Sequence, residues 1–275
     1  MSNQTICFIG GGNMARSLIG GLINDGVKPQ FITVAEPDAS RREELTNHFG
    51  VNVLADNVAA VNESDIVIFA VKPQVMKTAV LPIAEELSAK KPLLISIAAG
   101  IPISSLESWA GGDLAMVRAM PNTPALINAS ITALFASPQV LPKHRNQAES
   151  ILQAVGNAVW VEDEALMDTV TAVSGSGPAY FFYFMEALEQ AAIEEGLDGK
   201  TARLLTLETA LGAARLAIET EKSPSELRDQ VTSPGGTTEA AIQVFEHAAT
   251  KQIFKHAVTA ARKRSADLAI SSGKN

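Results

Sequence analysis

Short apolar runs alternate with amphipathic stretches over roughly the first 160 residues of the chain. The apolar runs are nearly continuous in Val, Ile and Leu, which is typical of strands that are covered on both faces. They predict strands at residues 5–9, 31–35, 51–54, 66–71, 93–97 and 114–118. Two further apolar stretches, residues 130–136 and 158–161, are candidates to extend the same sheet.

The stretches between these runs have helical spacing. The first of them places Ala15, Leu18, Ile19, Leu22 and Ile23 at intervals of three and four residues, which puts them on one face of a helix. Strands that alternate with helices predict an α/β fold with a mainly parallel, doubly wound sheet.

The pattern changes near residue 164. Ten of the thirteen prolines precede this position, and the later sequence reads as helix at residues 179–195, 200–221, 224–231 and 237–270. We therefore expect two domains, residues 1–163 and residues 164–275. The helical part is too apolar for a single surface layer, so a second subunit is its expected partner.

Composition narrows the function classes. The 275 residues are 47% hydrophobic and 19% charged, with a net charge of −8, which argues against disorder and against a nucleic-acid-binding protein. The single cysteine, Cys7, and four scattered histidines predict no disulfide framework and no metal site. Apolar runs are too short to span a membrane, and we expect a cytoplasmic protein in which Cys7 is a small buried side chain.

A glycine-rich loop links the first expected strand to the first expected helix. Its sequence, Gly10-Gly11-Gly12-Asn13-Met14-Ala15, fits the pattern G-x-G-x-x-A. The small residues allow a tight turn, a close approach of the pyrophosphate and close helix–strand packing. We interpret the loop as a dinucleotide-binding site; the alternative is a purely structural turn.

Glu36 stands at the end of the second expected strand. An acid at this place binds the adenosine ribose and disfavours a 2′-phosphate, which favours NADH over NADPH. Arg41 and Arg42 follow closely, and either of them could neutralise Glu36 or bind a phosphate. A solvated loop acid is the alternative, and the choice between NADPH and NADH stays open.

Two more turns follow expected strands at their carboxyl ends. They are Ala70-Val71-Lys72-Pro73 and Ala98-Ala99-Gly100. Ligands of open α/β sheets bind at this edge, so both turns suit a nicotinamide, although each by itself could be an ordinary turn.

Five segments together resemble the pyrroline-5-carboxylate reductase family, and the resemblance covers essentially the whole chain. In chain order they are residues 8–15 (FIGGGNMA), 70–73 (AVKP), 121–124 (PNTP), 174–180 (SGSGPAY) and 233–238 (SPGGTT). The last two are the most specific.

The resemblance implies a Rossmann-like N-terminal domain and an all-α C-terminal dimerisation domain. It implies an oxidoreductase that reduces L-1-pyrroline-5-carboxylate to L-proline, the last step of proline biosynthesis, with NADPH or NADH. It also implies a homodimer, which in this family often assembles into larger rings. The cofactor would contact the glycine loop, Asn57 at the ribose, Val71 and Lys72 at its middle, and Ala98 near the nicotinamide.

The resemblance places Glu164 at the mouth of the substrate site and gives the loop at residues 233–238 to the substrate, supplied by the partner subunit. The residues agree, because Ser233, Gly236, Thr237 and Thr238 offer hydroxyls and backbone N–H groups at a helix start, which suits a small carboxylate. The Thr238 hydroxyl is the candidate catalytic group, as a hydrogen-bond donor to the ring nitrogen. The alternative is that Thr237 or Thr238 only caps the helix.

Two other functions compete with this interpretation. A 3-hydroxyacid dehydrogenase needs a lysine early in the helix after the second glycine motif, and residues 179–199 contain none. A non-catalytic NAD(P)-binding regulator has no need of the intact loop at residues 233–238. The segment at residues 174–180 is either a tight connection between domains or a ligand contact.

Overall fold

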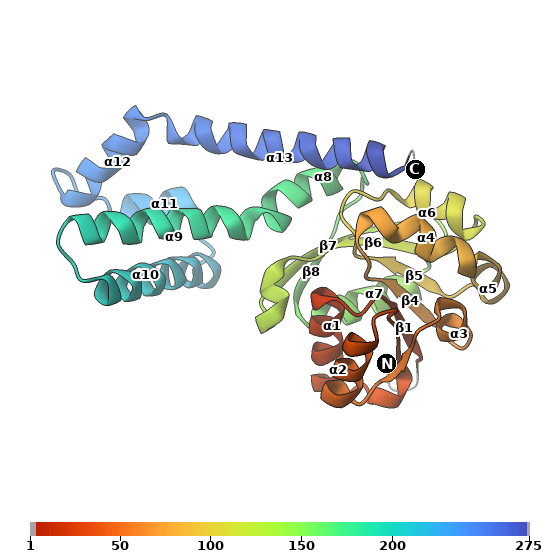
Figure 1. Ribbon diagram of the computed structural model, residues 1–275. Helices are drawn as coiled ribbons and strands as arrows, with labels where there is room; N and C mark the ends of the chain where they lie inside the picture. Colours follow the sequence, from red (N-terminus) through yellow and green to blue (C-terminus); the bar gives the residue numbers. More distant parts are fainter. Residues whose placement is uncertain (1–3, 274–275) are drawn as a thin grey trace. The chain divides into compact units, whose positions relative to one another are not determined.

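The N-terminal part of the chain is built on one eight-stranded sheet, seen in the computed structural model of Figure 1. The structure describes residues 4–273, and the surroundings of side chains up to residue 268. The strand order is β3-β2-β1-β4-β5-β6-β7-β8. The strands are β1 (Ile6–Ile9), β2 (Ile32–Ala35), β3 (Asn52–Leu54), β4 (Ile66–Phe69), β5 (Leu93–Ser96), β6 (Met116–Met120), β7 (Ser130–Ala136) and β8 (Gly156–Trp160).

Every expected strand is present, including the two candidates for extension. The neighbours pair in parallel except β6 and β7, which are antiparallel. Between these two strands the chain has room only for a short 3-10 helix, η4 (Thr123–Ile127). A parallel pairing would need a longer crossover, so the short connection explains the one reversal in the sheet.

Helices cover both faces of the sheet, as the uninterrupted apolar strands predict. In β1, Ile6 and Phe8 pack on one face while Cys7 and Ile9 pack on the other. The first face is covered by α1 (Asn13–Asn24), α2 (Ala39–Phe49) and α7 (Pro142–Gln153). The second is covered by α3 (Asn57–Val61), α4 (Met76–Val80), α5 (Ala84–Lys90) and α6 (Ile103–Ala110). The doubly wound α/β prediction is confirmed.

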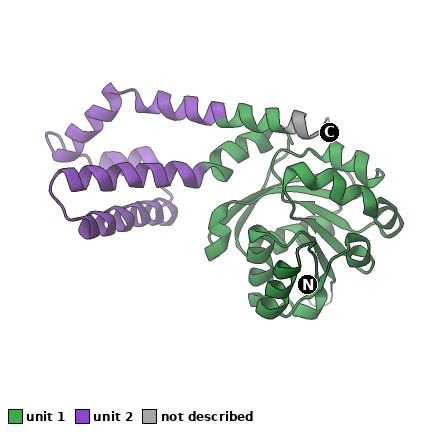
Figure 2. Ribbon diagram, in the orientation of Figure 1, with its two compact units in different colours: residues 1–176, 261–275 green, residues 177–260 purple. Residues whose placement is uncertain are grey.

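The chain forms two compact units, coloured separately in Figure 2. Unit 1 contains residues 1–176 and 261–275, and unit 2 contains residues 177–260. The helical sequence begins earlier than the unit boundary, because α8 (Leu166–Val170) and a π-helix (Thr171–Gly175) still belong to unit 1. The segment at residues 166–175 is therefore helical but belongs to the unit that contains the sheet.

Unit 2 is made of helices. They are α9 (Gly177–Glu194), α10 (Gly199–Glu219), α11 (Pro224–Gln230), α12 (Thr237–His247) and the first part of α13 (Thr250–Gly273). No helix among the described residues is long and apolar enough to cross a membrane.

The prediction of one continuous helix over residues 237–270 is wrong. The chain breaks between α12 and α13, where Ala249 has a φ of 51°, outside the range of a right-handed helix. The apolar stripe shows the same break, because it passes from Ala248 to Ile253 in a step of five residues instead of three or four.

Candidate nucleotide and substrate sites

The glycine loop lies at the carboxyl end of β1, where its conformation requires glycine. Gly10 has a φ of 99°, which side chains other than glycine rarely adopt. A Cβ at this position would also lie 2.9 Å from the carbonyl oxygen of Ala70. The loop can therefore pass close to the end of β4 only because residue 10 has no side chain.

Gly12 begins α1 and leaves the start of this helix open. It is the N-cap residue, and no side chain caps the helix there. A Cβ on Gly12 would meet no atom within 4 Å. Free N–H groups at a helix start, with open space in front of them, suit the phosphates of a dinucleotide.

Two cavities adjoin this loop, and most of the predicted cofactor-binding residues line one or both of them. The first cavity, of about 710 Å³, is lined by Asn13 and Met14 together with Gly11, Gly12, Ala70, Val71 and Lys72. The second cavity, of about 560 Å³, is lined by Glu36 and Asn57 together with Gly10, Gly11, Gly12, Ala70, Val71 and Lys72. Asn57 is the first residue of α3, and its amide donates to the carbonyl of Ala79, 3.3 Å away.

The Glu36 carboxylate is tied to the glycine loop. It accepts hydrogen bonds from the backbone N–H groups of Gly11 at 2.9 Å and of Asp38 at 3.1 Å, and the residue is only 4% exposed. The two arginines that follow have different surroundings. The Arg42 guanidinium donates to the carbonyls of Glu36 and Pro37, whereas Arg41 lines both cavities.

A third cavity, of about 340 Å³, lies where β4 and β5 end. Pro73, Ala99 and Gly100 line it from these strand ends, and Thr171 and Ser176 line it from the π-helix and the turn after it. The last part of α13 closes it with Arg264 and Ser265. Ala98 is buried next to this cavity-lining turn.

Ser265 links α13 to the sheet-bearing unit. Its hydroxyl donates to the Asp168 carboxylate on α8, 2.7 Å away, and the residue is buried. This hydrogen bond joins two elements of unit 1 that are 97 residues apart. It fixes the helix that carries Arg264 against the helix that leads into Thr171.

Glu164 lies between β8 and α8 and has two partners. Its Oε1 atom accepts from the Arg118 guanidinium at 3.0 Å and from the backbone N–H of Ile103 at 2.8 Å. Ile103 is the first residue of α6, which follows the Ala98–Gly100 turn. Glu164 thus connects the end of β6 to the turn that lines the third cavity.

The loop at residues 233–238 lies in unit 2. Its helix, α12, begins at Thr237 after the N-cap residue Gly236, and no side chain caps it, so Thr237 and Thr238 do not act as capping residues. The N–H of Gly235 donates to the Glu239 carboxylate, 2.7 Å away. The N–H of Gly236 donates to the carbonyl of Ser233, 3.0 Å away. Two N–H groups of the predicted carboxylate cradle are therefore satisfied within the chain itself.

Sequence reasoning missed two polar residues at these sites: Arg118 and Glu239. Arg118 had a signal, because it is a charge within an otherwise apolar strand, and it is buried. Charged side chains are rarely buried without a partner, and Glu164 is that partner. Glu239 had no such signal, since an acid in the first turn of a helix is common.

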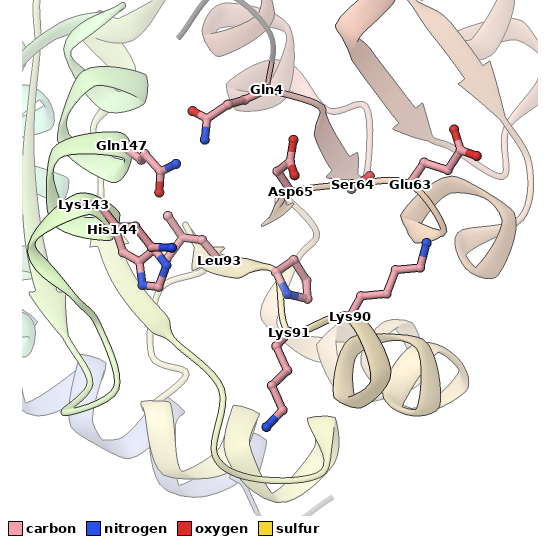
Figure 3. Close-up of a pocket in the computed structure, with 11 residues that line it drawn as sticks. Gln4, Glu63, Ser64, Asp65, Lys90, Lys91, Leu93, Lys143, His144 and Gln147 are labelled. Atoms are coloured by element: carbon pink, nitrogen blue, oxygen red, sulfur yellow. The ribbon is translucent and has the colours of Figure 1, made fainter.

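A fourth cavity, of about 540 Å³, lies at the opposite edge of the sheet (Figure 3). Gln4, Asp65 and Pro92 line it just before β1, β4 and β5 begin. Its polar side chains do not converge, since Lys91 points away from Asp65 in Figure 3. Within residues 4–273, no group of three or more His, Cys, Asp or Glu side chains could hold a metal ion.

Comparison with known protein families matches both parts of the chain. Residues 164–268 match the family described as pyrroline-5-carboxylate reductase dimerisation. Residues 5–100 match the family described as NADP oxidoreductase, coenzyme F420-dependent. The second match covers the glycine loop, Glu36 and the turns after β4 and β5.

Individual relatives are similar over nearly their full lengths. A pyrroline-5-carboxylate reductase of Pseudomonas aeruginosa is 48% identical over 269 residues, 98% of each chain. The solved structure of a pyrroline-5-carboxylate reductase from Coxiella burnetii is 45% identical, with a TM-score of 0.92 over 96% of this chain and 98% of that one. A Plasmodium falciparum pyrroline carboxylate reductase with NADP bound is 28% identical, with a TM-score of 0.87 over 98% of this chain and 99% of that one.

Proposed function

From the membership of this chain in the pyrroline-5-carboxylate reductase family, which the comparisons establish, we propose a reaction and a role for each site. The enzyme reduces the C=N bond of L-1-pyrroline-5-carboxylate and forms L-proline. The full-length similarity to pyrroline-5-carboxylate reductases carries the assignment, and it is supported by the uncapped start of α1 behind Gly12, at the carboxyl edge of a doubly wound sheet. This is the place where such folds bind dinucleotides.

The residues present fit NADPH or NADH. Gly12 leaves open space before the α1 N-terminus, and the first N–H groups of that helix, at Asn13 and Met14, hold the phosphates. The cofactor supplies a hydride when it is bound. The cavity of Pro73, Ala99 and Gly100 takes the nicotinamide end, while the Glu36 and Asn57 cavity takes the adenosine end.

Arg41 is the residue that binds the 2′-phosphate of NADPH. Its guanidinium lines the adenosine cavity, whereas the guanidinium of Arg42 is engaged with two backbone carbonyls. Arg41 therefore attracts a 2′-phosphate and Glu36 repels it. The balance of these two charges sets the ratio of NADPH to NADH use.

The loop at residues 233–238 holds the substrate carboxylate, and a partner subunit supplies it. The N–H groups at the start of α12 face a small anion, and the Thr238 hydroxyl donates a hydrogen bond to the ring nitrogen. Glu164, held by Arg118 and Ile103, stands at the mouth of the site. A hydrogen bond to the ring nitrogen makes the C=N carbon of the neutral cyclic imine more electrophilic, so these residues mainly align that carbon and exclude water.

A homodimer follows from the surface of unit 2. Large apolar side chains are exposed in the single chain along α9 and α10, among them Phe181, Phe182, Tyr183, Leu204, Leu211 and Ile218. Monomeric proteins rarely expose contiguous apolar patches of this kind. A second copy of the chain covers them, and such dimers are the building block for a larger ring.

The cytoplasm is the proposed compartment. The sequence has one cysteine, and this residue is buried. Proteins of oxidising compartments more often rely on disulfides. Fractionation of cells that express the protein naturally would show which compartment contains it.

A steady-state assay tests the reaction. The purified protein is given L-1-pyrroline-5-carboxylate with NADPH and, separately, with NADH, and oxidation of the nicotinamide and formation of proline are followed. Substrate-dependent oxidation with at least one cofactor is expected. If neither cofactor is oxidised, the proposed function is wrong.

A further inference from the structure

The backbone carbonyl of Ser174 lacks its ordinary helical partner. In an α-helix, a carbonyl accepts from the N–H four residues later, and for Ser174 that residue is Pro178, which has no N–H. Ser174 lies in the π-helix, where the N–H of Ser176 donates to the carbonyl of Thr171, 2.8 Å away and five residues back. The α-helical donor is thus absent at the Ser174 carbonyl, and the five-residue spacing of a π-helix would use the N–H of Ala179 instead.

Asn122 supplies a side-chain donor. Its side-chain N–H donates to the Ser174 carbonyl at 3.1 Å, although the two residues are 52 positions apart in the sequence. Asn122 follows β6 and begins η4, and it is only 8% exposed. The amide of Asn122 thus takes the place of the N–H that Pro178 lacks.

The other half of the same amide fixes its orientation. Asn122 Oδ1 accepts from the backbone N–H of Ile131 at 3.1 Å and from the Ser130 hydroxyl at 3.0 Å. In a flipped amide, Oδ1 would face the Ser174 carbonyl and the NH₂ group would face the Ile131 N–H. Both of these contacts are repulsive, so the hydrogen-bond network allows one orientation.

The segment held in this way forms a wall of the third cavity. Thr171 and Ser176, on either side of Ser174, line that cavity opposite Pro73, Ala99 and Gly100. Gly175 lies against Met120 at the end of β6, because a Cβ on Gly175 would be 2.6 Å from the Met120 Cε atom. Asn122 therefore sets the distance between the end of β6 and the cavity wall.

We propose that Asn122 is a positioning residue for the reaction: it compensates for Pro178 at the Ser174 carbonyl and holds the π-helix as a wall of the nicotinamide cavity. This inference rests on the proposed function, which gives that cavity to the nicotinamide. It assigns one task to two sequence motifs, PNTP at residues 121–124 and SGSGP at residues 174–178.

Asn122→Asp removes the donor and keeps the acceptor. The matched control is Asn52→Asp, because the Asn52 amide also donates to a backbone carbonyl, that of Gln30 at 3.1 Å, but on the edge strand β3. Loss of one buried hydrogen bond corresponds to a change of about tenfold. We expect Asn122→Asp to lower kcat about tenfold or more, with the KM for NAD(P)H unchanged. Hydrogen exchange at residues 171–176 should become about tenfold faster. The control should change neither.

Pro178→Ala provides the rescue, because it restores an N–H four residues after Ser174. In Asn122→Asp/Pro178→Ala, kcat and slow exchange at residues 171–176 should recover by more than half of the loss on a logarithmic scale. No effect of Asn122→Asp beyond the control, or a loss that Pro178→Ala does not relieve, would overturn the proposal.

The hydrogen-exchange measurement separates this proposal from the proposed reaction. If the wild-type protein has no reductase activity, exchange at residues 171–176 still decides whether Asn122 holds the π-helix. If Asn122→Asp does not fold, Pro178→Ala alone decides. Exchange in that variant, which keeps Asn122 and gains an N–H, should be as slow as in the wild type or slower, and faster exchange would contradict the proposal.

Discussion

The Arg118 guanidinium lies 3.0 Å from the Glu164 carboxylate, and this pair joins β6 to the segment before α8. The Arg118 side chain is 6% exposed and that of Glu164 is 25% exposed. Because the Ile103 N–H donates to the same oxygen, Glu164 is held from two directions. A carboxylate at the mouth of a substrate site gains a fixed position from these contacts.

Removing the cation of this pair should destabilise the protein. Arg118→Met leaves the Glu164 carboxylate without its charged partner, which we expect to cost about 2–3 kcal/mol of the free energy of unfolding, measured in urea. The matched control is Arg215→Met, since Arg215 pairs with Glu219 on the surface of α10 and is 68% exposed. That variant should lose about 0.5 kcal/mol or less. Equal losses of unfolding free energy in the two variants would mean that the buried Arg118 pair stabilises the protein no more than the exposed Arg215 pair does.

Thr238→Ala tests the donor to the ring nitrogen. We expect kcat to fall about tenfold to a hundredfold, because a hydrogen bond that strengthens as the hydride is transferred stabilises the transition state. The Kd of NAD(P)H should stay the same, since we propose that this loop binds the substrate and not the cofactor. Thr238→Ser keeps the hydroxyl and should retain most of the activity. If Thr238→Ala has wild-type kcat, the ring nitrogen has another partner.

Glu36→Ser should shift cofactor use toward NADPH. Removal of the negative charge beside the adenosine cavity leaves Arg41 to bind a 2′-phosphate, and we expect the ratio of kcat/KM for NADPH to that for NADH to rise about tenfold. Glu36→Gln separates the effect of the charge from that of the hydrogen bond to the glycine loop, because the Gln amide oxygen can still accept from the Gly11 N–H. Both variants should shift the ratio in the same direction. An unchanged ratio in both would show that Glu36 does not face the ribose.

The buried Cys7 thiol should make stability depend on pH in alkaline solution. Burial raises the pKa of this thiol from 9.0 to about 12. Above pH 9 the unfolded chain loses the thiol proton while the folded chain keeps it, so rising pH favours unfolding. Between pH 9 and pH 12 the wild type should lose about 1.4 kcal/mol of unfolding free energy per pH unit more than Cys7→Ala does. Parallel pH profiles of the two proteins would contradict this expectation.

Leu211→Glu tests the dimer. Leu211 lies in the middle of α10 and is 54% exposed in the single chain. A charge buried against a second copy is unfavourable, so light scattering should show dissociation at concentrations where the wild type is dimeric. Leu141→Glu in unit 1, where Leu141 is 52% exposed, is the matched control and should leave the mass unchanged. A dimeric Leu211→Glu protein would place the interface elsewhere.

The sequence predicts the sheet well, because each strand and each covering helix has its own hydrophobic pattern within a few neighbouring residues. The strands Ile6–Ile9 and Ile66–Phe69 are apolar without interruption, and the glycine loop has few other conformations open to it. The order of the elements then follows from the alternation of strand and helix. The antiparallel β7 differs because its connection to β6 is short.

Contacts between distant segments could not be predicted in the same way. Nothing near Asn122 in the sequence indicates that its partner is the carbonyl of Ser174, and Arg118 and Glu164 are 46 residues apart. The π-helix Thr171–Gly175 was missed because it runs directly into residues 174–178 (SGSGP), which have the composition of a turn. Its helical geometry is stabilised in part by the hydrogen bond from Asn122.

Unit 1 is assembled from distant parts of the sequence, since residues 261–268 of α13 belong to the same compact unit as residues 4–176. During synthesis, the strands that carry the nucleotide loop leave the ribosome long before Arg264 and Ser265 do. An early Rossmann-like intermediate therefore has its dinucleotide loop but lacks one wall of the third cavity. Unit 2 is an insertion in the sequence between these two segments, so a nascent chain would have the glycine loop long before it had the α13 residues that line the third cavity.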